Sequence, residues 1–245
     1  KGALAALKEK ENFDLVFVGK ESGIKSVLAG EEYDELHVSV INAEDVISCN
    51  ESPADAIRKK PDSSIVKSVK ILKDDDNAGA FVSAGSTGAV LTAAVLLSPR
   101  IKGVNRPALA PLFPNMKGGE TLFLDCGANV DCKPINLVQF ALMGSVYMSE
   151  VKGVANPRVA LLSNGTEDAK GNTLTKDAFA LLKDCGGINF VGNMEARDIL
   201  SGDYDVVVTD GFNGNIALKS MEGAIGCIFT ELKKEIYSSF SSKIG

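Results

Sequence analysis

The sequence predicts an α/β protein with a mostly parallel sheet and helices on both of its faces. Short apolar runs rich in Val, Ile, Leu and Phe alternate with segments of helical period along almost the whole chain. No internal repeat interrupts this alternation, and 245 residues are enough for one large α/β domain or two small ones. Because strands separated by helices pair in parallel and are covered on both sides, the pattern favours a two-faced sheet.

Seven short, mostly apolar runs that end in turn residues are predicted as buried strands. In chain order they cover 14–19, 36–41, 78–85, 120–127, 158–165, 188–193 and 204–211. Between most of them, apolar residues recur at the spacing of a helix. The predicted helices cover 63–75, 87–97, 136–151, 174–183 and 214–237, and Lys1 opens a further stretch that is typical of a helix.

The segment 98–120 breaks this regular alternation. It contains four prolines and three glycines, which is typical of a long excursion between elements. We expect a single α/β domain over residues 1–245 and leave open a two-lobed organisation around 98–120.

Charge and composition narrow the class of protein. The net charge of −6 argues against nucleic acid as a partner, and 45% apolar with 24% charged residues is typical of a soluble globular protein. The sequence has no run of eighteen apolar residues and no signal-peptide pattern. Five cysteines, an odd number without a Cys-x-x-Cys pair, favour a reducing cytosol and no zinc site.

Five of the predicted strands end in small or amide-bearing turns. These turns cover 83–88, 125–129, 163–166, 192–193 and 210–215. In parallel α/β sheets, ligands bind outside the carboxyl ends of strands, and glycine lets a ligand approach the backbone. We therefore expect these turns to line one cleft.

The first of these turns is a candidate phosphate site, because it joins a strand to a helix. Ser83, Gly85, Ser86, Thr87 and Gly88 offer N–H groups and hydroxyls at the positive end of the helix. Helix capping by the same residues explains the pattern equally well. The sequence lacks a Walker A loop and a Gly-x-Gly-x-x-Gly fingerprint, so no cofactor is expected.

Lys170 is the one lysine among the polar residues of a later turn, 166–172. Its ammonium could hold a phosphate or stabilise charge that develops on a carbonyl oxygen. A solvated lysine beside Glu167 and Asp168 is the commoner case for such a pattern. Both interpretations stay open on spacing alone.

Other polar residues have competing structural explanations. Asn129 and Asp131 could contact a ligand or cap the helix ahead of Pro134. The single histidine, His37, lies in a strand pattern and is predicted to be structural, and no Gly-x-Ser-x-Gly elbow is present. Covalent catalysis is therefore not expected, and Cys126 is interpreted as a small buried thiol.

A series of motifs closely resembles the PlsX family, the bacterial phosphate acyltransferases that use acyl carrier protein. In order these are "SAGSTGA", "RPALAP", "LDCGANVDCKP", "QFALMGSVY", "PRVALLSNGTEDAKGN", "INFVGNMEARD" and "DVVVTDGFNGN". The resemblance spans about residues 1–240. It implies a fold similar to that of phosphate acetyltransferases and of isocitrate and isopropylmalate dehydrogenases. It also implies a reaction in which inorganic phosphate attacks the thioester of a long-chain acyl carrier protein, giving acyl phosphate for phospholipid synthesis.

The resemblance implies two catalytic residues, Lys170 and Asn215. We hypothesise that Lys170 neutralises phosphate or the developing charge and that the Asn215 amide donates to the oxyanion or to phosphate. Asn213 would then be a spare amide in the same turn. The residues expected to bind phosphate or substrate are Ser83, Gly85, Ser86, Thr87, Gly88, Asn129, Asp131, Asn172, Asn193, Asp210, Gly211 and Gly214. No metal is expected.

The chain departs from the family pattern at two positions and at its ends. Ser86 and Ser163 stand where the family usually has asparagine. Family members begin with a further strand that carries Asp-Ala-Met-Gly-Gly-Asp and continue beyond Gly245. We therefore expect a domain truncated at both ends relative to the family.

The last helical segment carries an apolar stripe beside lysines. The stripe consists of Ile225, Ile228, Phe229, Leu232, Ile236 and Phe240, and the lysines are Lys233, Lys234 and Lys243. Core packing or a dimer interface is the default explanation. The resemblance favours a homodimer in the cytoplasm that touches the inner face of the membrane, with glycerol-3-phosphate acyltransferase as a further partner.

Acidic carrier protein is expected to dock on a basic patch. The candidates are Arg58, Lys59, Lys60 and Arg197, although a solvated face explains any one of them. Two other functions stay open: a phosphate acetyltransferase-like enzyme that uses acyl-CoA, and a non-catalytic, membrane-associated binding module on the same fold.

Overall fold

The computed structural model describes residues 1–10 and 12–238. The chain divides into two compact units, Lys1–Lys102 and Gly103–Gly245. The boundary between them falls within the proline- and glycine-rich segment 98–120.

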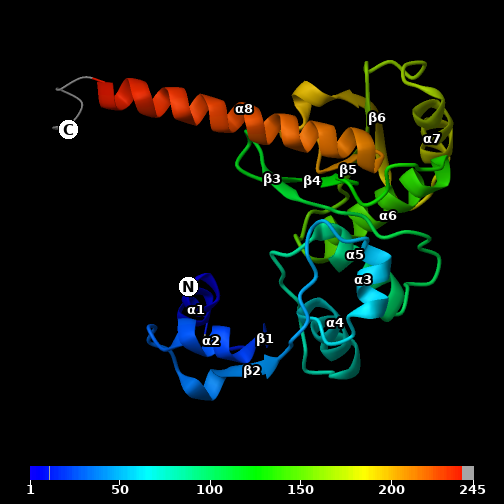
Figure 1. Ribbon diagram of the computed structural model, residues 1–245. Coiled ribbons are helices and arrows are strands. Elements are labelled where there is room, and N and C mark those ends of the chain that lie inside the picture. The colour runs from blue at the N-terminus through cyan, green and yellow to red at the C-terminus, as the bar shows by residue number, and fades with distance from the viewer. Residues whose placement is uncertain (11, 239–245) are drawn as a thin grey trace. The chain divides into compact units, whose positions relative to one another are not determined.

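The first unit combines a small parallel sheet with helices (Figure 1). Its strands β1 (Leu15–Gly19) and β2 (Val38–Asn42) pair in parallel, with Leu15 opposite Val38. Buried apolar side chains of the last three helices form a separate core. The helices are α1 (Gly2–Glu9), α2 (Glu21–Leu28), α3 (Pro53–Lys59), α4 (Ser64–Asp74) and α5 (Thr87–Leu97), and a 3-10 turn covers Glu35–His37.

The predicted strand at 78–85 is wrong, because this segment has no regular secondary structure. Three of its residues are alanine and two are glycine, which contribute little side-chain packing to a sheet. Its Val82 is 92% exposed, and no strand of the first unit pairs with the segment. An apolar run becomes a strand only where a neighbouring strand accepts its hydrogen bonds.

The second unit is built on a five-stranded sheet with the order β3-β4-β7-β5-β6. Four of its strands are parallel, and β3 is an antiparallel edge strand beside β4. The strands are β3 (Leu112–Pro114), β4 (Glu120–Leu124), β5 (Arg158–Ser163), β6 (Asn189–Glu195) and β7 (Val206–Val208). The fold class, a mostly parallel sheet with helices, is confirmed.

Helices cover both faces of this sheet, as the alternation of its buried side chains requires. Alternate residues of β4, β5 and β7 pack against α6 (Pro134–Glu150) and α7 (Thr173–Lys183). The intervening residues, such as Phe123 and Val207, pack on the other face with residues of α8 (Gly211–Ser238) and with Ile199, which directly follows the 3-10 turn Ala196–Asp198. Two apolar cores therefore lie on opposite sides of one sheet, and Figure 1 shows the ribbons of α6 and α8 on its two sides.

The ends of these helices follow the local chemistry of the sequence. Pro134 is the first residue of α6, and the N–H of the preceding Lys133 donates to Asn136 Oδ1 at 2.8 Å. This contact excludes Asn129 and Asp131 as the cap of α6. The last helix begins at Gly211 rather than Gly214, because the carboxylate of Asp210 caps its first turn.

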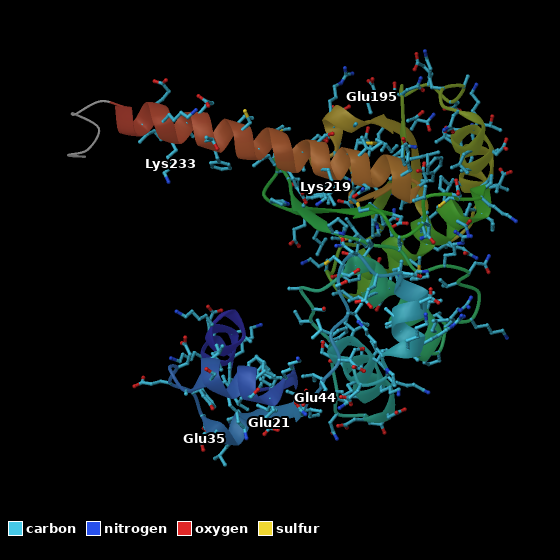
Figure 2. All side chains as sticks on the ribbon, in the orientation of Figure 1. Glu21, Glu35, Glu44, Glu195, Lys219 and Lys233 are labelled. Carbon is cyan, nitrogen blue, oxygen red and sulfur yellow. The ribbon has the colours of Figure 1, made fainter. Side chains whose placement is uncertain are left out.

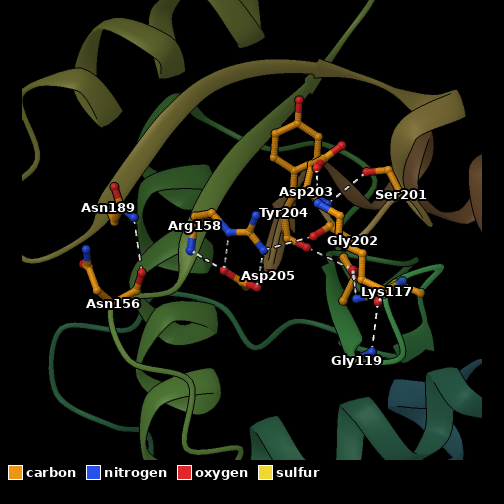
Figure 3. Close-up of polar contacts among 12 residues, drawn as sticks. Lys117, Gly119, Asn156, Arg158, Asn189, Ser201, Gly202, Asp203, Tyr204 and Asp205 are labelled. Carbon is orange, nitrogen blue, oxygen red and sulfur yellow. Dashed lines mark hydrogen bonds and ion pairs between the residues drawn. The ribbon is translucent and has the colours of Figure 1, made fainter.

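A cluster of ion pairs and amide contacts lies at the amino ends of the parallel strands (Figure 3). Arg158 begins β5, and its guanidinium donates to both carboxylate oxygens of Asp205 at 2.9 Å. The Arg158 backbone N–H donates to the same carboxylate, and Lys117 pairs with Asp203. Burial raises the pKa of Asp205, but the hydrogen bonds and charge of Arg158 outweigh burial and hold it below its usual value.

Candidate functional site at the carboxyl edge of the second sheet

Three loops meet at the carboxyl edge of the second sheet, because they follow strands that are direct neighbours. The strands β4, β7 and β5 lie side by side in parallel. The loops after them cover 125–133, 209–210 and 164–172. This edge is where parallel α/β sheets bind ligands.

Asp125 joins two of these loops and was not among the residues predicted from the sequence. Its side chain is fully buried and accepts four hydrogen bonds. Oδ1 accepts from the N–H of Leu109 (2.9 Å) and Ala128 (3.1 Å), and Oδ2 accepts from the N–H (2.7 Å) and side-chain amide (2.8 Å) of Asn129. An acidic residue directly after a buried apolar strand is the sequence signal that could have identified it.

The Asn129 side chain is committed to this internal network. Its amide nitrogen also donates to the Pro107 carbonyl at 2.7 Å, and its backbone carbonyl accepts from the Gly211 N–H at 2.8 Å. Asn129 therefore connects its own loop to Pro107 and to the start of α8. Asp131 is exposed, and its backbone carbonyl accepts a bond from Arg106.

Gly211 and Gly214 let the first turn of α8 pack against the 125–129 loop. A Cβ on Gly211 would lie 2.6 Å from the Asn129 carbonyl oxygen, and one on Gly214 would overlap the Asp125 carbonyl oxygen. No side chain fits at either position, so the two glycines are required by backbone contact between two parts of the site.

Asp210 is buried, and its carboxylate accepts hydrogen bonds from the first turn of α8 instead of facing the open edge of the sheet. Its Oδ1 accepts from the N–H groups of Phe212 and Asn213, and its Oδ2 accepts from the Asn213 amide at 2.6 Å. The first donors of α8 are therefore already satisfied by a carboxylate of the chain itself. This feature makes the N-terminus of α8 a poor binding site for a free anion.

Asn215 lies beside the 125–129 loop. A Cβ on Gly127 would come within 3.6 Å of the Asn215 side chain, including its Oδ1. The Asn215 amide has no hydrogen-bond partner among residues 1–10 and 12–238 and is exposed. It is free to donate to a ligand at this edge.

Lys170 lies on the neighbouring 164–172 loop and is exposed. Its side chain passes over Gly165, where a Cβ would lie 2.8 Å from Lys170 Cγ. Within the described part of the chain its ammonium makes no ion pair. The structure shows no direct contact between Lys170 and Asn215 in that same part. Lys170 lies on the loop after β5, and Asn215 lies in the first turns of α8, which follows the neighbouring strand β7.

Three asparagines fix the shape of the Lys170 loop. Asn164 Oδ1 accepts from the Gly171 N–H, and the Asn193 amide donates to the Glu167 carbonyl at 2.8 Å. Asn172 caps α7 by accepting from the Thr175 N–H at 2.9 Å. Asn193 and Asn172 therefore position the loop, and their predicted contacts with substrate stay predictions.

A pocket of about 800 Å³ opens between this loop, the turn Ala196–Asp198 and the first half of α8. Polar residues such as Ser163, Asn172 and Asn213 line one part of it, and apolar residues such as Ile199 and Met221 line another. The Ser163 hydroxyl oxygen is buried and has no hydrogen-bond partner within the described residues. Such groups in native proteins usually find a partner in water or a ligand.

The predicted phosphate loop, 83–88, belongs to the first unit. Ser86 caps α5 by accepting from the Ala89 N–H at 3.4 Å, and Ser83 Oγ accepts from the Gly85 N–H at 3.1 Å. The helix-capping interpretation is therefore confirmed for Ser86. Thr87 and Gly88 form the first turn of α5, and their N–H groups have no protein partner in the part of the chain that is described.

Cys126 and His37, for which the sequence predicted no catalytic role, make contacts within the protein. Burial, and to a lesser degree the neighbouring Asp125, raise the pKa of the Cys126 thiol to about 12, and its Sγ donates to the Phe123 carbonyl. Such a thiol is not a nucleophile at neutral pH. His37 lies in the 3-10 turn before β2, and its Nδ1 lies 2.6 Å from Asp14 Oδ1.

Comparison with solved structures defines the class of fold. The chain is similar to the EutD phosphotransacetylase from Staphylococcus aureus, with a TM-score of 0.63 and 17% identity over 92% of this chain and 78% of that one. It is also similar to a phosphotransacetylase from Streptococcus pyogenes, with a TM-score of 0.59 and 18% identity over 89% of this chain and 76% of that one. The protein therefore has the phosphotransacetylase-like α/β fold.

Comparison of sequences defines the family. Residues 1–245 match the family model described as "Fatty acid synthesis protein". Proteins named phosphate acyltransferase are 51% identical in Clostridium novyi and 50% identical in Halothermothrix orenii, in both cases over all of this chain and 73% of the relative. The chain belongs to the fatty acid synthesis protein family, and its resemblance to the PlsX family is confirmed.

Proposed function

We propose that this protein is a phosphate acyltransferase that moves a long-chain acyl group from the thioester of acyl carrier protein to inorganic phosphate. The product is an acyl phosphate for phospholipid synthesis. Membership of a family whose relatives carry the name phosphate acyltransferase supports the reaction. The observation that carries the proposal is a pair of donors at the carboxyl edge of the second sheet, Lys170 on the loop after β5 and Asn215 in the first turns of α8, neither of which has a partner among the described residues.

The proposed chemistry needs no nucleophilic side chain, because phosphate is itself the nucleophile. A phosphate oxygen attacks the thioester carbon, an O–C bond forms, and the carbonyl oxygen becomes an oxyanion. The oxyanion then collapses, the C–S bond breaks, and the proton of hydrogenphosphate ends on the released thiol. Cys126, the buried thiol at this edge, is protonated at neutral pH, which is consistent with a direct displacement.

The protein must therefore bind, orient and stabilise charge. In our proposal the Lys170 ammonium offsets the negative charge of phosphate and of the oxyanion. The Asn215 amide donates to the oxyanion or to phosphate from the first turns of α8. Both groups are exposed and without partners in residues 1–10 and 12–238, as a donor reserved for a ligand would be.

We further propose that the first unit, taken by itself, binds an anion such as phosphate through the N–H groups of Thr87 and Gly88. They form the positive end of an 11-residue helix, α5, and Ser86 leaves these two donors unused when it caps the helix. Ser83, Gly85 and Ser86 would shape this loop. In the second unit, Asn129, Asp210, Gly211 and Gly214 would hold the backbone around the site.

The proposed acyl donor is a carrier protein, and the proposed assembly is a homodimer at the inner face of the membrane. The far half of α8 projects beyond the sheet of its unit (Figure 1). Along it Ile225, Ile228, Phe229, Leu232 and Ile236 are exposed, and Lys233 points away from the unit (Figure 2). Within the described residues this stripe is not packed in a core, and Phe240 and Lys243 lie outside those residues.

No described helix is long and apolar enough to cross a membrane. Contact with the membrane would therefore be made by a surface such as this exposed stripe. Glycerol-3-phosphate acyltransferase, as the consumer of acyl phosphate, is the further proposed partner.

The proposal is tested by phosphate-dependent release of free carrier thiol from palmitoyl carrier protein. The wild-type chain, Lys170→Ala and Asn215→Ala are compared, with Lys183→Ala as the matched control because Lys183 is exposed on α7 and pairs with Asp168. We expect turnover to require phosphate and to fall by about 10²–10³ in each of the two site variants. Turnover without phosphate, or equal activity in all four proteins, would contradict the proposal.

The same assay separates the acyl donors. Palmitoyl-CoA is offered at the concentrations used for palmitoyl carrier protein. A higher kcat/KM with the coenzyme A thioester would favour the phosphate acetyltransferase-like function. Binding of acyl carrier protein without turnover on either donor would favour a non-catalytic binding module.

A further inference from the structure

We infer that the 800 Å³ pocket beside α8 holds the fatty acyl chain of the donor, with the thioester at its polar end. This inference rests on the proposed function and adds to it the place of the chain and the residues that limit chain length. Cavities of about 300–1,000 Å³ suit organic ligands far larger than a phosphate ion. The pocket is therefore built for more of the substrate than its phosphate.

One face of α8 forms a wall of this pocket. Asn213, Ile216, Ala217, Ser220 and Met221 all line it. From Asn213 these positions recur after three and four residues, at 216 and 217 and again at 220 and 221, so they lie on one side of the helix. The stripe begins with a polar residue at the start of the helix and becomes largely apolar farther along it.

The apolar end of the pocket opens onto the core of the second unit. Ile199 is buried in the cluster that also contains Phe123 and Met194, and Leu162, Ala217 and Met221 pack against that cluster. All four of these pocket residues are without charge. A saturated chain placed here would bury its methylene groups against the core, at about 0.8 kcal/mol for each CH₂ removed from water.

The polar end of the pocket supplies groups that suit a thioester carbonyl. The Ser163 hydroxyl oxygen is buried and lacks a partner among the described residues. Asn172 and Asn213 line the same region, beside the loop that carries Lys170. A hydroxyl in this state is satisfied when a carbonyl oxygen accepts its proton.

Asn213 and Asn215 lie close together on α8, so the pocket and the proposed catalytic amide share the same helix turn. Asn213 faces the pocket, and Asn215, two residues later, faces the Gly127 turn. Residues two apart project from different sides of a helix. An acyl chain in the pocket would thus place its carbonyl at the start of α8, between the Lys170 loop and the Asn215 amide.

Charge at the mouth of the pocket favours a neutral chain inside it. Among the described residues that line the pocket, Arg197 alone is charged, and it is paired with Glu195 and Asp198 at the surface. A ligand with a buried ionic group would find no free counter-charge in this lining. A neutral chain with a single polar head group fits it.

Ala217→Phe tests the inference, since a phenyl ring would fill the apolar end. Ala180→Phe makes the same change at an exposed position of α7 and serves as the control. The probe is cis-parinaric acid, an eighteen-carbon fluorescent fatty acid, titrated into the full chain. We expect binding to the wild type and to Ala180→Phe, and affinity at least about tenfold weaker in Ala217→Phe.

A second variant guards against misfolding. Ser220 is exposed but lines the outer part of the pocket, so Ser220→Trp should narrow the pocket without disturbing the core. It should also weaken binding of the probe. If folded Ala217→Phe and Ser220→Trp, checked by circular dichroism and Tm, both bind the fatty acid as the wild type does, the inference is overturned.

Turnover separates failure of this inference from failure of the proposed function. With palmitoyl and hexanoyl carrier protein as donors, Ala217→Phe should lose about tenfold or more in kcat/KM for the long chain and little for the short one. Equal losses on both chains would overturn the pocket assignment while leaving the acyltransferase intact. Absence of phosphate-dependent turnover in the wild type, with fatty acid binding that still follows Ala217, would contradict the enzyme and support the pocket as a fatty acid site.

Discussion

The amino and carboxyl edges of the second sheet use the same kinds of residue in opposite ways. At the amino edge, Arg158 and Asp205 satisfy each other with three hydrogen bonds, and Lys117 pairs with Asp203 (Figure 3). At the carboxyl edge, the buried oxygens of Ser163 and Asn193 have no partner, and neither does the Lys170 ammonium, within the described residues.

This contrast separates stability from function within one sheet. Paired polar groups at the amino edge offer nothing to a ligand but hold the strands in register. Unpaired groups at the carboxyl edge cost stability and are retained where a ligand or water can satisfy them. Mutations of paired groups should therefore cost stability, and mutations of unpaired groups should cost activity, which gives the predictions below.

The largest effect is expected for Asp125→Ala, because the Asp125 carboxylate is fully buried and accepts four hydrogen bonds at the open edge. Four donors would lose their acceptor, and hydrogen bonds to a carboxylate are worth more than neutral ones. We expect about 3–5 kcal/mol of destabilisation in urea unfolding, together with loss of turnover.

A conservative variant distinguishes positioning from simple support. Asp125→Asn keeps one acceptor oxygen but places an NH₂ group against donors. It should retain more stability than Asp125→Ala while kcat stays low, with little change in KM, because the Asn215 side of the site is misplaced. Wild-type kcat in a folded Asp125→Asn variant would show that the network has no part in positioning the site.

A smaller effect is expected at the amino edge, and it should depend on pH. The pKa of Asp205 is lower in the folded chain than its ordinary value of about 3.9, so its contribution to stability is present above that value and is lost as pH falls through the folded pKa. Asp205→Asn should cost about 1–2 kcal/mol at pH 7, and the difference from wild type should shrink below about pH 4.

Urea unfolding of both proteins at pH 7, 5 and 3.5 measures this difference. The specific activity of folded Asp205→Asn should equal that of the wild type at pH 7. A stability difference that stays constant across the three pH values would mean that the ion pair with Arg158 does not stabilise the fold.

The smallest effect concerns thiol reactivity. Because the pKa of Cys126 is raised to about 12 by burial, its thiol should resist iodoacetamide at pH 8 in the folded chain. Cys49 and Cys227 are exposed and should be labelled first. Mass spectrometry of peptides after brief labelling measures the order, and early labelling of Cys126 would show that this edge of the sheet opens.

Strands of the second sheet could be predicted because both of their faces are buried. The runs at 120–127, 158–165 and 204–211 contain the residues of β4, β5 and β7, whose apolar side chains alternate between two cores. The run at 78–85 has similar hydrophobicity but no strand beside it. The local sequence pattern shows only that a segment is apolar. Whether the segment forms a strand depends on pairing with another strand in the folded protein.

The short elements were not predictable in the same way. α2 is eight residues long and contains glycine and two serines, and α3 is seven residues long. Windows of this length hold about two helical turns, too few for a clear period. The antiparallel strand β3 lies inside the 98–120 segment and pairs with β4 over only three residues. The prolines of this segment favour a loop, so the sequence gives no sign of a strand there.

For the site, the sequence indicated the correct loops but not the partner of each side chain. It predicted polar turns after 120–127, 158–165 and 204–211, and topology brings these three to one edge. Asp210 was not predicted as the cap of α8, although that contact is local. The sequence could not show that Asn193 supports the Lys170 loop, because this contact depends on which strands are neighbours. Asp125 was missed although it directly follows a buried apolar strand, because its role depends on the donors of Leu109, Ala128 and Asn129 that surround its carboxylate.

The central claim is that the carboxyl edge performs the chemistry and the amino edge holds the sheet. The most direct test measures phosphate-dependent kcat and Tm together for Lys170→Ala and Arg158→Ala. The account predicts that Lys170→Ala loses about 10²–10³ in kcat with an unchanged Tm, while Arg158→Ala lowers Tm and keeps kcat. A Lys170→Ala protein with wild-type kcat, or an Arg158→Ala protein with wild-type Tm and reduced kcat, would contradict it.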